Sequence, residues 1–249
     1  MPKSALVVGG TSGIGLSIAK ELSCMDYDDI YVIGRTAPIE DVSSNIIWIK
    51  FDLLSEDYSI FNRFKHVDTL IISAGFGRVS EFSNLNESYI VDSFKVNAIA
   101  PLRIVNMFYE KINSNEDFNC VIISSVSGFV SSPLFSIYSA TKASLNRFIE
   151  SVNIELEVSG VNNRILNVAP GYIEGTGFDK KDNSNSEKTS DLAKEILVKM
   201  FNRKELYIPK YEEIYRDVID RYIENPHEFG INSFEHKVNT GRLNKNKES

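Results

Sequence analysis

Residues 5–22, ALVVGGTSGIGLSIAKEL, decide the fold, because they run from a short apolar strand through a glycine-rich loop into an amphipathic helix. Glycines let the backbone turn sharply and let a phosphate group approach it closely. The start of the helix offers unpaired N–H groups and the positive end of the helix dipole. Strand, loop and helix in this order predict a dinucleotide-binding site. Its expected contacts are Gly9, Thr11, Ser12, Gly13, Ile14 and Gly15.

The rest of the chain alternates strands with longer helices. The expected strands are Ala5–Val8, Ile30–Ile33, Ile46–Phe51, Thr69–Ser73, Cys120–Ser124, Ile165–Val168 and Leu206–Ile208. The expected helices are Ile14–Leu22, Tyr89–Ile112, Ala140–Val158 and Asp191–Phe201. Short, nearly all-apolar strands that alternate with helices indicate a parallel sheet buried on both faces. This pattern predicts an α/β fold, a doubly wound Rossmann-type sheet of about seven strands with helices on both faces.

The chain is expected to form a single domain over residues 1–249, since no repeat or proline-rich linker divides it. The polar stretch DKKDNSNSEKTS, residues 179–190, predicts a mobile substrate loop near 176–190. After residue 209 we expect one further helix, Tyr211–Glu224, and then a tail from Asn225.

Composition excludes several kinds of partner. The formal net charge of −7 argues against a general nucleic-acid or anionic-membrane binder, since both require a basic surface. The two cysteines, Cys24 and Cys120, are too few for a disulfide scaffold or a metal site, and both are expected in the core. No apolar run approaches the ~20 residues of a membrane span, and the first residues do not resemble a signal peptide, so a cytoplasmic location is predicted.

A second segment, SIYSATKASLN at residues 136–146, carries the candidate catalytic pair. Tyr138 and Lys142 are four residues apart, so a helix presents both on one face. A free tyrosine has a pKa of about 10. A nearby ammonium is expected to lower that pKa and to make Tyr138 a general acid or base. The alternative is that both are ordinary amphipathic side chains on a helix surface.

Two more polar residues complete a candidate site. Ser125 follows the strand in VIISSVSGF, 13 residues before Tyr138, and could donate to a carbonyl oxygen that becomes negative. Asn97 is followed by Pro101, which lacks the N–H that would bond the Asn97 carbonyl in a helix. The alternatives are a serine-rich turn and a tolerated helix irregularity.

The spacing Gly9-x-x-x-Gly13-x-Gly15, the Tyr-x-x-x-Lys pair and the Ser125–Tyr138 interval together resemble the short-chain dehydrogenase/reductase family. The resemblance implies hydride transfer with a catalytic set of Ser125, Tyr138, Lys142 and Asn97. Lys142 and Tyr138 would also bind the nicotinamide ribose, and Asn97 would hold a water that links the lysine to solvent. Val8 and Ser73 depart from the family, which usually has threonine and asparagine there.

The second strand ends in YVIGRT, which bears on the cofactor. A carboxylate at its end would bind a ribose 2′-hydroxyl, but this position is Gly34 and Arg35 follows. A guanidinium suits a 2′-phosphate, so NADP(H) is preferred and NAD(H) possible, the alternative being a solvated surface arginine. The resemblance adds further cofactor contacts at Asp52, Leu53, Ala74, Gly75, Pro170, Gly171, Ile173 and Thr176.

The sequence thus predicts an NADPH-dependent oxidoreductase that reduces a carbonyl to an alcohol, or runs the reverse. The alternatives are a non-catalytic NADP-binding regulator and an enzyme like the sugar-nucleotide epimerases and dehydratases. The partner is a small-molecule carbonyl or alcohol. The residues expected to ring its pocket, with Arg78 as an anion anchor, are Phe76, Arg78, Phe129, Leu134, Phe135, Tyr172 and Phe178. A homodimer or homotetramer is expected, with an interface on the helices Tyr89–Ile112 and Ala140–Val158.

Overall fold

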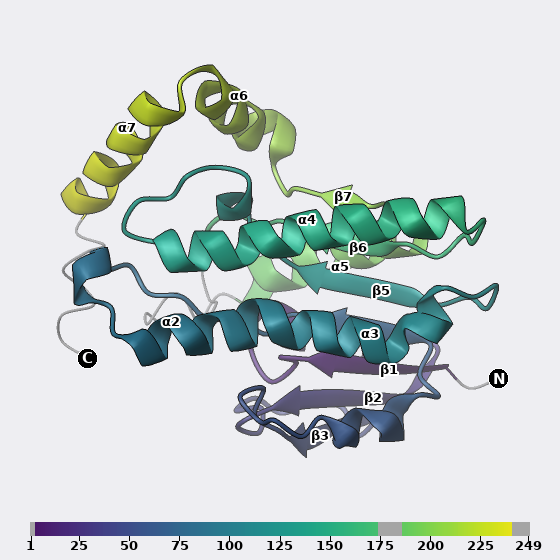
Figure 1. Ribbon diagram of the computed structural model, residues 1–249. Coiled ribbons are helices and arrows are strands. Elements are labelled where there is room, and N and C mark those ends of the chain that lie inside the picture. The colour runs from purple at the N-terminus through teal and green to yellow at the C-terminus, as the bar shows by residue number, and fades with distance from the viewer. Residues whose placement is uncertain (1–2, 174–185, 241–249) are drawn as a thin grey trace.

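The computed structural model describes residues 3–173 and 186–240, apart from the side chains of residues 186 and 187. Within these residues, one parallel sheet has the strand order β3-β2-β1-β4-β5-β6-β7 (Figure 1). Its strands are β1 (Lys3–Val8), β2 (Tyr27–Gly34), β3 (Ile46–Lys50), β4 (Thr69–Ile72), β5 (Asn119–Ile123), β6 (Ile165–Val168) and β7 (Leu206–Tyr207). The predicted doubly wound fold of about seven strands is confirmed.

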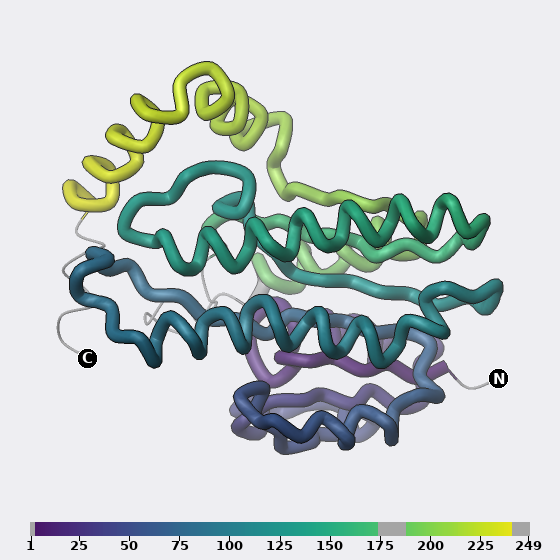
Figure 2. The backbone as a smooth tube through the Cα atoms, in the orientation of Figure 1, coloured from purple at the N-terminus to yellow at the C-terminus, as the bar shows by residue number. Residues whose placement is uncertain are grey.

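Helices cover both faces of the sheet (Figures 1 and 2). The α-helices are α1 (Gly13–Ser23), α2 (Glu87–Phe94), α3 (Ala100–Ile112), α4 (Ser136–Val158), α5 (Ser186–Phe201), α6 (Arg216–Glu224) and α7 (Pro226–Asn239). Helices α1 and α5 pack on one face of the sheet and α3 and α4 on the other. Short 3-10 turns span Ser59–Phe64, Phe82–Asn84 and Val126–Gly128, and π-helical turns span Lys95–Ile99 and Tyr211–Tyr215.

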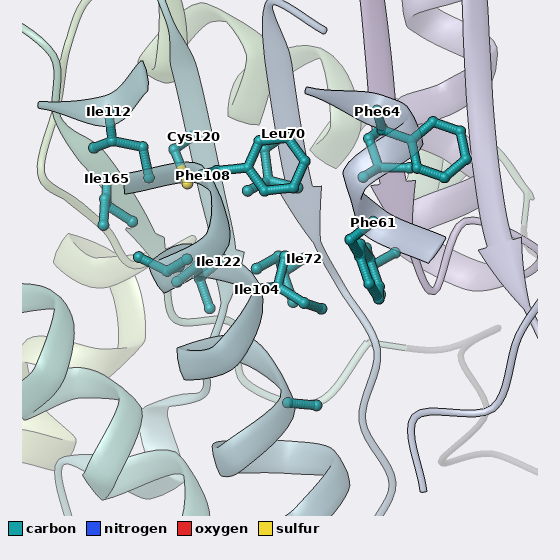
Figure 3. Packing of buried hydrophobic residues seen from close by; sticks show 14 of the residues in the cluster. Phe61, Phe64, Leu70, Ile72, Ile104, Phe108, Ile112, Cys120, Ile122 and Ile165 are labelled. Atoms are coloured by element: carbon teal, nitrogen blue, oxygen red, sulfur yellow. The ribbon is translucent and has the colours of Figure 1, made fainter. Parts of the chain in front are cut away.

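Alternation along β1 explains why the sheet has two cores. Leu6 and Val8 join the cluster beneath α3 and α4, whereas Ala5 and Val7 join the cluster beneath α1 and α5. Successive side chains of a strand point to opposite faces, so a strand with apolar residues at every position is buried on both. Figure 3 shows the first cluster, in which Ile104 and Phe108 of α3 lie against Leu70, Ile72 and Ile122 of the sheet.

The end of the chain differs from the prediction. The residues expected as a tail from Asn225 form α7 instead. Asn225 caps this helix, because its side chain accepts a hydrogen bond from the Glu228 N–H, and Pro226 occupies the first turn. Both are helix-start signals that the sequence contains. The structure also begins α5 at Ser186, so residues 186–190 of the predicted loop are helical, whereas 176–185 lie outside the described residues.

Two smaller findings concern the cysteines and the helices. Cys120 is buried as expected, but Cys24 is exposed at the end of α1 and does not belong to the core. None of the described helices combines the length and the apolar character that crossing a bilayer requires.

Candidate active site

The candidate site lies at one edge of the sheet, because all strands are parallel and their carboxyl ends therefore meet there. The loops after β1, β4, β5 and β6 carry most of the predicted residues to this edge. Figure 1 shows these loops on the side where α2 and α4 begin, with α7 beside them. Ligands of open α/β sheets bind at the carboxyl ends of the strands.

The loop after β1 is packed too tightly for side chains at two of its glycines. Gly9 has φ +81°, and a Cβ there would lie 2.5 Å from the backbone nitrogen of Ala74. A Cβ on Gly15 would lie 2.3 Å from the carbonyl oxygen of Gly9. The predicted glycine spacing therefore has a physical cause, since it brings α1, the loop and the end of β4 into direct contact.

The start of α1 is open to an anion. Ser12 is its N-cap residue but makes no side-chain capping bond, and the first turn contains no acidic residue. The first N–H groups of a helix have no partner within the helix, and with the positive dipole end they suit a phosphate group. The residues at this end therefore fit the pyrophosphate of a dinucleotide.

The end of β2 carries a glycine and an arginine in place of a carboxylate. A Cβ on Gly34 would lie 2.5 Å from Thr11 Oγ1, so the packing of Thr11 excludes a carboxylate at this position. Arg35 follows, is exposed, and makes no ion pair within the described parts of the chain. Thr11 thus belongs to the glycine loop and also packs against the end of β2. The sequence alone did not predict this second contact.

Asp52 and Leu53 follow β3. Asp52 is exposed, and its Oδ1 accepts the Leu54 N–H at 3.0 Å, which closes a turn and leaves Oδ2 for a ligand. Leu53 is a buried core residue, and its carbonyl accepts the Tyr58 hydroxyl at 2.7 Å. The Leu53 side chain therefore anchors the loop after β3 to the hydrophobic core.

The segment after β4 brings two catalytic candidates together. Ala74 donates its N–H to the Val8 carbonyl at 3.1 Å, which holds the segment against β1. A Cβ on Gly75 would lie 3.3 Å from Lys142 Nζ and 3.4 Å from Asn97 Oδ1. The absence of a side chain at Gly75 lets these two polar groups share one small space.

Ser125 and Tyr138 lie close enough for the Ser125 hydroxyl to lower the pKa of the Tyr138 phenol. Ser125 also donates to the Pro170 carbonyl at 3.3 Å and accepts from Ser127 Oγ at 2.8 Å. Burial raises the pKa of Tyr138 to about 12, and the nearby hydroxyl of Ser125 offsets part of this effect. The lowered pKa that the sequence led us to expect is therefore wrong for the protein alone. Ser127 was not predicted as a site residue, because it lies two positions after Ser125 and so falls outside the expected spacing to Tyr138.

Lys142 is enclosed near Tyr138. Lys142 is only 3% exposed, and its Nζ donates to the Ile123 carbonyl at 2.9 Å. Nζ lies 5.6 Å from the centre of the Tyr138 ring. Burial lowers the pKa of Lys142 to about 8, because removal from water disfavours the charged form. One helix, α4, thus presents both members of the predicted pair to the same buried space.

Asn97 lies in the π-helical turn between α2 and α3. Its Oδ1 accepts the Phe76 N–H at 2.9 Å and its Nδ2 donates to the Phe76 carbonyl at 2.7 Å. Nδ2 also approaches Thr141 Oγ1 at 3.3 Å. The predicted helix irregularity is real, and it lets the Asn97 side chain hold the segment after β4. Such π turns are frequent at functional sites.

The turn after β6 meets the C-terminal segment. A Cβ on Gly171 would lie 1.5 Å from Tyr215 Oη, so the Tyr215 ring end occupies the place of a side chain there. Burial raises the pKa of Tyr215, and the backbone of Tyr172 near its hydroxyl offsets part of this effect. Pro170 is buried, Ile173 packs against the core under α1 and α5, and Thr176 lies outside the described residues. Tyr215 is a second residue that sequence reasoning missed.

The predicted pocket residues divide into two groups. Phe129 and Tyr172 line a cavity of about 1160 Å³ that also borders α5 and β7, and none of the four catalytic candidates lines it. Phe135 instead stacks on Tyr138, with ring centres 4.4 Å apart. Arg78 lies over the Tyr89 ring at 4.8 Å, and its buried Nε has no hydrogen-bond partner among the described residues. Phe178 lies outside the described residues.

Comparison with known proteins agrees with this geometry. An uncharacterized oxidoreductase of Staphylococcus epidermidis is 26% identical over 206 residues, which are 76% of this chain and 88% of that protein. Carbonyl reductase family member 4 of Xenopus laevis is 27% identical over 211 residues, covering 80% of this chain and 83% of its own.

Solved structures share the fold. A short-chain dehydrogenase from Streptomyces avermitilis has a TM-score of 0.73 at 20% identity, covering 96% of this chain and 99% of its own. One from Burkholderia cenocepacia, in complex with NADP, has a TM-score of 0.71 at 20% identity, covering 88% and 97%. Residues 3–187 match the family model described as short chain dehydrogenase. The chain therefore belongs to the short chain dehydrogenase family of NAD(P)-dependent oxidoreductases.

Proposed function

We propose that this protein reduces the carbonyl group of a small molecule to an alcohol with NADPH, or runs the reverse oxidation with NADP⁺. The observation that carries the proposal is that Tyr138 and the buried Lys142 share one enclosed space, with Lys142 Nζ 5.6 Å from the Tyr138 ring centre and the Ser125 hydroxyl close enough to lower the pKa of Tyr138. When bound, the nicotinamide supplies or accepts the hydride at the reacting carbon. The chain's own groups then have to bind the oxygen and move one proton.

Ser125 and Tyr138 provide two hydroxyl groups that can meet one carbonyl oxygen. The Ser125 hydroxyl polarises that oxygen, and Tyr138 Oη gives it a proton. Because burial raises the pKa of Tyr138 to about 12, its hydroxyl is protonated at neutral pH, as reduction requires. The ammonium of Lys142 stabilises the phenolate that remains after the proton has left.

Lys142 and Asn97 complete the set. Both border the space beside Gly75, which supports a role for Lys142 in binding the nicotinamide ribose. The backbone carbonyl of Asn97, which Pro101 leaves without the N–H of a regular helix, would hold a water that returns a proton to Lys142 from solvent. The bonds of the Asn97 side chain to Phe76 fix the position of this residue.

Tyr138→Phe tests the assignment. We expect kcat for NADPH-dependent reduction, measured over a panel of aldehydes and ketones, to fall by about 10²-fold or more, because general acid catalysis is lost. Tyr27→Phe is the matched control, since it removes another buried hydroxyl, hydrogen-bonded to Thr69 at 2.6 Å, far from the site. Activity of Tyr138→Phe within a few-fold of native would contradict the role of Tyr138.

We further propose NADPH over NADH, which the exposed Arg35 and the absence of an acid at Gly34 support. Arg35→Ala should lower kcat/KM for NADPH by about 10- to 100-fold, the range for hydrogen bonds to charged groups, and leave that for NADH nearly unchanged. The exposed Arg63, on the 3-10 turn after β3, provides the matched alanine control. An equal loss with both cofactors would overturn the proposal.

We also propose that the protein acts as a homodimer or homotetramer in the cytoplasm, with α3 and α4 at an interface. Ile154 and Val158 of α4 are 57% and 84% exposed, and a second copy would cover them. Analytical ultracentrifugation of the native protein checks this expectation. A monomer at the protein concentration of the activity measurements would contradict it.

A further inference from the structure

The last helix, α7, is tied to the loop that precedes Tyr138. Lys237 of α7 is only 8% exposed. Its Nζ donates to the Pro133 carbonyl at 2.7 Å, to Ser132 Oγ at 2.8 Å and to Ser233 Oγ at 3.3 Å. A lysine is rarely buried unless its ammonium is hydrogen-bonded, and these partners supply that requirement. The contact is therefore a specific one between α7 and residues 132–133.

The turn that Lys237 holds has an unusual backbone. Leu134 has φ +63°, a conformation that residues other than glycine rarely adopt. Its carbonyl accepts the Ser80 N–H at 2.8 Å. The turn is thus held at Pro133 by α7 and at Leu134 by the segment after β4. Unfavourable backbone conformations persist only where the surroundings impose them.

The next residue, Phe135, touches the candidate proton donor. Its ring is stacked on Tyr138 with an interplanar angle of 28°. A Cβ on Gly77 would lie 2.7 Å from Tyr138 Cδ2 and 2.8 Å from Phe135 Cζ, so Gly77 closes the other side of this ring pair. A displacement of the turn would therefore move Phe135 from Tyr138 and let water reach it.

We propose that Lys237 is a positioning residue of the active site: by holding the Ser132–Leu134 turn, it keeps Phe135 against the ring of Tyr138. The packing of α7 agrees, since a Cβ on Gly230 would lie 3.6 Å from Ser131 Oγ. This inference rests on the proposed role of Tyr138 as proton donor. It makes α7, which follows the last strand by almost twenty residues, a part of the catalytic machinery.

Lys237→Met tests the inference, because it keeps the apolar stem and removes the donors. The readout is nitration of Tyr138 by tetranitromethane at pH 8, followed by peptide mass spectrometry. We expect nitration to become about 10-fold faster, since each unit of fall in the pKa of Tyr138 raises the phenolate fraction tenfold. The kcat for reduction should fall about 10-fold, because Tyr138 is displaced from its productive geometry. KM for NADPH should stay unchanged, because Ser132, Pro133 and Ser233, to which Lys237 donates, are not among the proposed cofactor contacts.

Lys111→Met is the matched control. Lys111 Nζ also donates to a loop carbonyl, that of Val67 at 2.6 Å, but near the opposite end of the sheet. It should leave nitration of Tyr138 unchanged. Lys237→Arg keeps charge and donors and should recover part of the protection, and Ser132→Ala, which removes one acceptor, should give a smaller increase.

Unchanged nitration in Lys237→Met, or an equal increase in Lys111→Met, would overturn the inference. Because nitration requires no turnover, this outcome is separate from the test of the proposed function. If Tyr138→Phe retained activity, the proposed function would fail, while nitration would still decide whether Lys237 shields Tyr138.

Discussion

The hydroxyl of Tyr138 and the ammonium of Lys142 are both held where water is scarce. Burial raises the pKa of Tyr138 to about 12 and lowers that of Lys142 to about 8, because removal from water disfavours the charged form of each group. Functional sites often contain such shifted groups, and proteins bear their cost in stability. At the scale of single residues, the groups that serve the reaction therefore lower the stability of the folded protein.

Lys142→Met should reveal this cost. Below pH 8 the native protein holds a charged lysine whose pKa lies below the ordinary 10.5, which costs about 3 kcal/mol. Loss of the bond to the Ile123 carbonyl offsets about 1 kcal/mol. We expect the free energy of unfolding to rise by about 2 kcal/mol at pH 7.

The lowered pKa of Lys142 also fixes how the stability of the native protein changes with pH. Between pH 8 and 10.5 the unfolded chain binds the Lys142 proton and the folded chain does not, so native stability rises with pH in this window. The advantage of Lys142→Met should therefore shrink between pH 7 and pH 9.5 in urea unfolding without cofactor. An advantage that stays constant, or a variant that is less stable at pH 7, would contradict the assignment.

At the scale of elements, two interruptions of regular structure build the site. The glycine loop before α1 leaves the helix start open, and the π turn at Lys95–Ile99 places Asn97 on Phe76. Pro101 lies in the first turn of α3, which begins at Ala100, and the Ala100 N–H bonds to the Lys95 carbonyl, five residues back. Regular α-helix over this stretch would lack that turn.

Two glycines, one in this loop and one just after α4, form a matched pair for a stability prediction. Gly9 and Gly160 both have positive φ, +81° and +76°, but a Cβ meets Ala74 at Gly9 and nothing within 4 Å at Gly160. Alanine at Gly160 should cost only the backbone term, about 1–2 kcal/mol. Alanine at Gly9 should cost at least about 2 kcal/mol more, because the strand end must shift. Equal losses in chemical denaturation would contradict this account of the loop.

At the scale of the whole molecule, the sequence predicted what depends on local pattern. All seven strands were expected, because each contains a short run of apolar residues. The pairing of Tyr138 with Ser125 followed from their spacing. Contacts between elements that are far apart in the sequence were not predicted. Lys237 of α7 donates to the Pro133 carbonyl, and Tyr215 Oη packs against Gly171. The direction of the Tyr138 pKa was also wrong, since burial is not visible in a motif.

The measurement that tests the central claim most directly follows deuterium from the C4 position of labelled NADPH into the product. The native protein, incubated with a panel of carbonyl compounds, should give an alcohol that carries deuterium at the former carbonyl carbon. Tyr138→Phe should bind NADPH but yield almost none. NADPH bound by the native protein without label in any product would contradict the proposed reductase and favour a non-catalytic binding role.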